Sequence, residues 1–195
     1  AQMEQTGFDY RARCERVQAR LRDANIDYLI VGPSSDMFYL IGMNRPQSER
    51  INMLLIPKEG RILQVLPAFE SALAEPLATF FDFTTWEETE SPAEKIASLL
   101  PNRGSGLKIG VADKVFVHFQ YLLQAAIPGA TFVSGGAVMN PVRMVKEPLE
   151  LEYLTQAGAA ADRTYAALLQ QPLIGKNEIE AKALLYELMT QYGHD

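Results

Sequence analysis

Few residues of this chain have the types and the spacing that a catalytic centre requires. The 195 residues include two histidines, His118 and His194, and one cysteine, Cys14, and these three lie far apart in the sequence. A metal centre gathers several His, Cys, Asp or Glu ligands, often in short spacings such as H-E-x-x-H or C-x-x-C, and neither spacing occurs. We therefore expect no metal site within this chain, and we interpret His118 as a surface residue of a helix.

Patterns for nucleophilic catalysis are equally weak. No G-x-S-x-G elbow occurs, and Ser34-Ser35 is better explained as a helix cap than as a nucleophile. Glutamates cluster at residues 87–90 and 147–152, where they are typical of solvated helix ends, because the helix dipole favours negative charge at a helix start. We expect this chain alone to be inactive as an enzyme.

Composition excludes several other classes of protein. Hydrophobic residues make up 48% of the chain, which is enough to build a core, and the net charge is -6 with scattered basic residues, which argues against a nucleic-acid partner. Residues 1–16 are polar where a secretory signal would be apolar, and the longest apolar run, residues 37–43, is too short to span a membrane. We expect a cytoplasmic protein without a membrane segment.

Hydrophobic periodicity predicts the elements that would position any functional side chain. Apolar residues spaced by four and three predict an amphipathic helix over 9–25, followed by a strand over 27–31 and a short helix over 37–41 that Ser34-Ser35-Asp36 can cap. Two apolar runs, 51–56 and 61–66, flank a turn-rich link and predict an antiparallel hairpin. Further elements are expected as helix 68–77, strand 79–83, helix 91–100 with Ser91 as its cap, strand 107–111, helix 116–126 and strand 130–133.

The pattern of elements changes after Pro141. A long helix is predicted over 148–170, and Asn177 with Glu180 forms a capping pair for a second helix. Two helices alone make a poor core. We therefore predict an α/β domain over residues 1–140, with a mixed sheet flanked by helices, and over 141–195 a linker and the first helices of an incomplete domain.

Three sequence blocks resemble one known family. Residues 27–42 resemble the strand and Asn-x-x-Tyr-Leu-Thr-Gly block of creatinase-type amino-terminal domains, with Asp36 where Asn is common and Ile41 where Thr or Ser is common. Residues 140–157 resemble the link into the catalytic domain of Xaa-Pro dipeptidases and aminopeptidases P, written R-x-x-K-x-x-x-E-[IL]-x-x-[IL]-x-x-A. The matching residues are Arg143, Lys146, Glu150, Leu151, Leu154 and Ala157. Residues 175–180 resemble the opening of the second helix of the pita-bread domain, with Asn177 in place of Thr.

This resemblance implies that the chain is the amino-terminal, non-catalytic part of a metallopeptidase, which caps the substrate and forms a homodimer. The catalytic pita-bread domain would bind two divalent metal ions (Mn, Co or Zn) through ligands that lie beyond Asp195, and a proline-containing peptide would be the substrate. Two alternatives stay open. The chain would then belong to a creatinase-like small-molecule amidinohydrolase, or to a metal-less protein that uses the peptidase fold for binding.

The resemblance also implies candidate substrate-binding residues. In such dimers an arginine that follows the Tyr-Leu-x-Gly block can meet a substrate carboxylate in the partner subunit, and Arg50 falls at the matching place. Arg45 in the same loop is the second candidate, and Trp86, which we expect in a polar loop, is the third. The alternative interpretation of Arg50 is a surface residue paired with Glu49 or Asp82.

Overall fold

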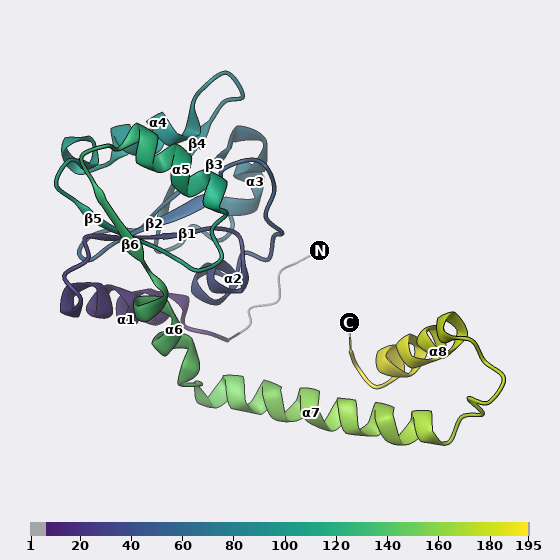
Figure 1. The fold of residues 1–195 in the computed structure, drawn as a ribbon. Coiled ribbons are helices and arrows are strands. Elements are labelled where there is room, and N and C mark those ends of the chain that lie inside the picture. Colours follow the sequence, from purple (N-terminus) through teal and green to yellow (C-terminus); the bar gives the residue numbers. More distant parts are fainter. Residues whose placement is uncertain (1–6, 195) are drawn as a thin grey trace. The chain divides into compact units, whose positions relative to one another are not determined.

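The computed structural model describes residues 7–194, which divide into two compact units. The first unit comprises Asp9–Val145, and the second comprises Lys146 onward together with Gly7 and Phe8. The first unit has an α/β fold, in which helices lie on both faces of a sheet (Figure 1). The second unit contains long helices.

A six-stranded mixed sheet forms the centre of the first unit. Its strands are β1 (Tyr28–Val31), β2 (Met53–Pro57), β3 (Leu63–Pro67), β4 (Asp82–Trp86), β5 (Lys108–Val111) and β6 (Thr131–Ser134). They are ordered β4-β3-β2-β1-β5-β6. The β1–β2 and β2–β3 pairs are antiparallel and the other pairs are parallel, so the predicted hairpin and the predicted mixed sheet are confirmed.

The helices of the first unit are α1 (Tyr10–Asp23), α2 (Ser35–Ile41), the 3-10 turn η1 (Ala68–Glu70), α3 (Ser71–Ala74), α4 (Pro92–Leu99), the 3-10 turn η2 (Pro101–Gly104), α5 (Val117–Ala126) and α6 (Gly136–Met144). Two of them, α2 and α4, begin at caps that the sequence predicts. The Ser34 side chain accepts hydrogen bonds from the backbone N–H groups of Asp36 and Met37, and Ser91 accepts one from Glu94. These hydroxyls satisfy donors that the first helical turn leaves unpaired.

Two predicted elements differ from the structure. Strand β4 begins three residues later than the predicted strand 79–83, and Trp86, predicted in a loop, is its last residue. The parallel pairing of β4 with β3 extends to Trp86, because Thr84, Thr85 and Trp86 suit a pleated sheet. The predicted helix 68–77 is reduced to η1 and α3.

Helix α6 was not predicted, since Pro141 lies inside it. Proline usually ends a helix, because it has no N–H group and its ring clashes with the preceding turn. Val138, Met139 and Val142 of α6 are nevertheless buried in the core, and this packing outweighs the local preference.

Alternating side chains of the strands pack into two apolar layers. In β1, Leu29 and Val31 lie in the layer that includes α1, α2 and α6, whereas Ile30 lies in the layer that includes α4 and α5. Cys14 of α1 is buried in the first layer, as predicted, and burial raises the pKa of its thiol to about 12. Its thiol is therefore protonated and unreactive at neutral pH.

Two capped helices dominate the second unit. They are α7 (Pro148–Leu169) and α8 (Glu178–Gln191). Asn177 and Glu180 form the predicted capping box, in which each side chain accepts a hydrogen bond from the other residue's backbone N–H group. Phe8 packs edge-on against Tyr153, with ring centroids 5.8 Å apart. Within residues 7–194, no helix combines the length and the apolar character needed to cross a membrane.

Asp27 joins the start of β1 to its neighbours on both sides. Its carboxylate accepts a hydrogen bond from the Lys108 backbone N–H group at 2.8 Å and pairs with Lys58 Nζ at 2.8 Å. These two contacts, the backbone hydrogen bond foremost, lower the pKa of Asp27 below its ordinary value. The folded state therefore holds the Asp27 proton less tightly than the unfolded state does.

Replacement of Asp27 by Asn should make the free energy of unfolding depend less steeply on pH in the acidic range. A lowered folded pKa contributes stability above the unfolded pKa, which is about 3.9 for Asp, and this stability is lost as the pH falls through the folded pKa. Urea midpoints measured from about pH 6 to about pH 2 should therefore fall less steeply in Asp27→Asn than in the parent. Glu75→Gln, at an exposed position, is the control. Equal slopes in the parent and in Asp27→Asn would contradict this role.

Candidate functional site

Both candidate arginines lie on one loop, which we call the arginine segment (residues 43–52). It joins α2 to β2 and contains no helix or strand. Gly42 ends α2 in the left-handed conformation, with φ 76°, and its missing Cβ leaves room for the Tyr10 ring. Met43 and Ile51 are buried near the two ends of the segment, so the apolar core holds both ends.

Arg50 is partly exposed and is paired with two glutamates. Its Nε donates a hydrogen bond to Glu88 Oε1 at 2.7 Å, and its Nη1 pairs with Glu49. Its guanidinium carbon lies 5.4 Å from the centre of the exposed Phe69 ring. The hydrogen bond to Glu88 raises the pKa of Arg50, so the charge is permanent.

The expected pairing with Asp82 is not found, because Asp82 receives two hydrogen bonds from Arg61 instead. Pairing with Glu49, the other expected partner of Arg50, is confirmed. Both glutamates that contact Arg50 are exposed. Solvated ion pairs of this kind are weak, so an incoming carboxylate can compete for the guanidinium.

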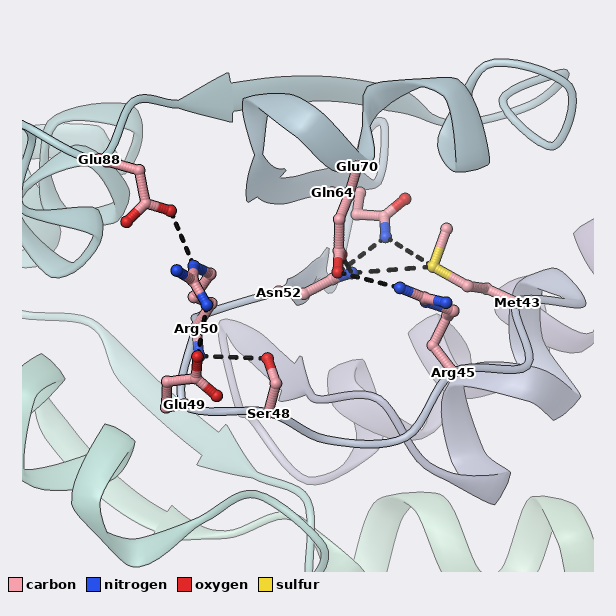
Figure 2. Close-up of polar contacts among 9 residues, drawn as sticks. All are labelled: Met43, Arg45, Ser48, Glu49, Arg50, Asn52, Gln64, Glu70 and Glu88. Carbon is pink, nitrogen blue, oxygen red and sulfur yellow. Dashed lines mark hydrogen bonds and ion pairs between the residues drawn. The ribbon is translucent and has the colours of Figure 1, made fainter.

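Arg45 lies nearer the start of the arginine segment. Its Nη2 is 3.4 Å from Glu70 Oε1, and 45% of its side chain is exposed whereas only 12% of the Glu70 side chain is. The two arginines thus share a segment, and each meets an acidic partner from a different part of the fold (Figure 2).

Trp86 lies behind the arginine segment rather than on its surface. Its side chain is buried, and its indole Nε1 donates a hydrogen bond of 2.8 Å to the carbonyl oxygen of Ile51. Since Ile51 directly follows Arg50, this bond fixes the backbone beside the guanidinium. The structure therefore shows Trp86 as a residue that supports the backbone of the arginine segment.

Four polar residues around the arginines were not singled out in the sequence as binding residues: Asn52, Gln64, Glu70 and Glu88. Gln64 Nε2 donates to Asn52 Oδ1 at 2.8 Å, and Asn52 Nδ2 donates to Glu70 Oε2 at 3.0 Å (Figure 2). A signal existed for two of them, because Asn52 and Gln64 interrupt the apolar runs 51–56 and 61–66. Glu70 and Glu88 carry no such signal.

Histidines and acidic residues do not form a metal site in the described part of the chain. His118 is exposed on α5, as predicted. Within residues 7–194 there is no group of three or more His, Cys, Asp or Glu side chains that could hold a metal ion. The two divalent ions that the resemblance implies are expected in the catalytic domain and not among these residues.

Comparisons with known proteins agree with this fold. A family model described as the creatinase/prolidase N-terminal domain matches residues 13–145. The probable dipeptidase PepE of Mycobacterium tuberculosis is 29% identical over 188 residues, which are 95% of this chain and 49% of that protein. The chain thus spans about half the length of the curated relatives it matches.

Solved structures show the same likeness. The crystal structure of dipeptidase PepE from Mycobacterium ulcerans matches with a TM-score of 0.85 and 29% identity, over 96% of this chain and 52% of that one. A prolidase from Thermococcus sibiricus matches with a TM-score of 0.87 and 20% identity, over 96% of this chain and 51% of that one. At that identity the prolidase shows a shared fold only.

Proposed function

The chain belongs to the creatinase/prolidase N-terminal domain family, and on this premise we propose that it forms the amino-terminal half of a dipeptidase. Support comes from the curated relatives that are described as dipeptidases and are about twice as long as the part matched here. Large apolar side chains on α7, such as Leu151 and Leu154, are exposed, and further polypeptide packed on this helix would cover them.

In this proposal the half described here binds the substrate and does not cleave it. The observation that carries it is the arginine segment, which presents Arg50 and Arg45 at the surface of an otherwise acidic chain. A guanidinium offers a planar fork of donors that matches a carboxylate, and a dipeptide has a free carboxylate at its carboxyl end. Trp86 supports the segment through the hydrogen bond that its indole N–H group donates to the Ile51 carbonyl oxygen.

The cleaving groups belong, in this proposal, to the other half of the enzyme. That half, of the pita-bread type, would begin with the linker and first helices over residues 141–195, and it would hold two divalent ions, Mn, Co or Zn. The arginine segment would act across a homodimer, over the active site of the partner subunit. We propose an Xaa-Pro dipeptide as the substrate and the cytoplasm as the location.

Replacement of Arg50 by Ala in the full-length protein tests this function. KM for an Xaa-Pro dipeptide should rise about 10- to 100-fold, because charge-assisted hydrogen bonds to the carboxylate are lost, while kcat changes little. The same dipeptide with its carboxylate converted to an amide should show almost no change. Arg61→Ala, which removes another exposed arginine of the same unit, is the matched control.

Other outcomes would point elsewhere. An unchanged preference for the free acid over the amide in Arg50→Ala would remove Arg50 from the substrate site. Turnover of a small guanidino compound but not of dipeptides would favour a creatinase-like amidinohydrolase. Absence of turnover with either substrate class, with Mn, Co or Zn added, would favour a binding protein on the peptidase fold.

A further inference from the structure

Two amide side chains are buried at the arginine segment, although Asn and Gln are mostly exposed in proteins. Asn52 is 4% exposed and Gln64 is fully buried, and the side-chain amides of both contact the sulfur of the buried Met43. Gln64 Oε1 is buried and has no hydrogen-bond partner among the described residues. An unsatisfied buried acceptor costs stability, and such departures from good packing concentrate at functional sites.

The two amides form a chain of hydrogen bonds with one direction. Gln64 donates to Asn52, and Asn52 donates to the Glu70 carboxylate, which can only accept when it is ionised. Gln64 lies in β3, where its Cα partners are Leu54 of β2 and Phe83 of β4. Because two neighbouring strands hold Gln64, the sheet also fixes the position of the Glu70 carboxylate.

Glu70 contacts the arginine segment at two places. Its Oε1 meets Arg45 near the start of the segment, and its Oε2 meets Asn52 at the end, so one carboxylate joins both ends (Figure 2). Arg50 lies between Arg45 and Asn52 in the sequence. The segment has no strand pairing of its own, and its shape depends on such side-chain contacts.

We propose that Glu70 is the positioning residue of the substrate-binding loop: its carboxylate, oriented by Asn52 and Gln64, holds the arginine segment in the shape that presents Arg45 and Arg50 to a substrate carboxylate. This inference rests on the proposed function. A simple surface ion pair between Glu70 and Arg45 would not explain the arrangement, because only 12% of the Glu70 side chain is exposed and a buried amide donates to its second oxygen.

Electrostatics agrees with this geometry. The pKa of Arg50 is raised chiefly by Glu88, then by Glu49, and Glu70 adds a smaller contribution in the same direction. Glu70 therefore lies close enough to influence both arginines, although it forms its ion pair with Arg45.

The test is Glu70→Gln in the full-length protein. Gln keeps the size of the side chain and an acceptor for Asn52, but it removes the charge that Arg45 meets. KM for an Xaa-Pro dipeptide should rise about 5- to 10-fold with kcat unchanged, and the dipeptide amide should be unaffected. Arg45→Ala combined with Glu70→Gln should raise KM no further than the larger of the two single effects, because the two residues act together.

Two further variants keep the test decisive. Asp82→Asn removes the carboxylate of an arginine pair of the same unit, the pair with Arg61, and should leave both substrates unchanged. Gln64→Met, which conserves volume, removes the far anchor of the hydrogen-bond chain and should raise KM for the free acid in the same direction even if Glu70→Gln does not fold.

Equal changes for acid and amide, or a fall in kcat, in Glu70→Gln and Gln64→Met would mark a merely structural role and overturn the inference. If Arg45→Ala and Arg50→Ala alter the preference for the free acid while both Glu70→Gln and Gln64→Met do not, the inference fails and the proposed function stands. If neither arginine variant alters that preference, the proposed function fails and the inference fails with it.

Discussion

Replacement of Arg143 by Met should lower the free energy of unfolding of the first unit by about 3–5 kcal/mol. Arg143 Nη1 is 2.5 Å from Asp36 Oδ1, and only 4% of the Asp36 side chain is exposed. Met fills a similar volume but leaves the Asp36 carboxylate in the interior without its counter-charge. A buried charge that has lost its partner destabilises the fold, whereas an apolar pair at the same place would not.

Urea unfolding followed by Trp86 fluorescence measures this effect in the whole chain. Trp86 is the one tryptophan of the sequence, and it is buried in the first unit, so its signal reports on that unit. Asp36→Asn combined with Arg143→Met should regain part of the loss, because a neutral amide is less costly to bury than a carboxylate. Arg61→Ala, at an exposed pair, should move the midpoint little. A loss below about 1 kcal/mol in Arg143→Met would contradict the role of the pair.

Replacement of Gly135 by Ala should destabilise the first unit by about 3 kcal/mol, because the added methyl group has no space. A Cβ at Gly135 would lie 2.9 Å from the backbone carbon and oxygen of Val111, and it would also overlap Leu29. The Gly135 N–H group donates to the Val111 carbonyl at 2.7 Å, so two backbone segments meet here directly. Relief of the overlap requires a shift of backbone rather than of a flexible side chain.

Gly158→Ala is the matched control for this prediction. Gly158 lies inside α7, and apart from its chain neighbours and the adjacent backbone of that helix, nothing lies within 4 Å of the place where its Cβ would be. Ala should favour that helix by about 0.5–1 kcal/mol and leave the Trp86 transition unchanged. The same Trp86 midpoint in Gly135→Ala as in the parent would show that the backbone can move at no cost.

Local patterns explain the elements that the sequence predicted well. The helix caps at Ser34, Ser91 and Asn177 depend on residues at most three positions apart, and all three are observed. The hairpin of β2 and β3 follows from two apolar runs and a short link. In contrast, α6 contains Pro141, and only its burial against the core explains why it is helical.

The candidate site was predicted only in part. Counting from Gly42 located Arg50 and Arg45 on one segment, because that segment is continuous in sequence. The partners of these arginines come from elsewhere: Glu70 follows β3, and Glu88 follows β4. Their approach depends on the order of strands in the sheet, which no local pattern specifies.

By itself the sequence determined the fold class and the helix caps, because these follow from local periodicity. It also singled out Asp36, Arg50 and Arg143, because each has a defined place in or after a block of neighbouring residues. Only the tertiary structure decided what these residues touch. It joined Asp36 to Arg143 across more than a hundred residues, buried Trp86 behind Arg50, and attached Glu70 to both ends of the arginine segment. Such contacts arise when burial of the apolar faces brings distant segments together, and side-chain pairing follows from that packing.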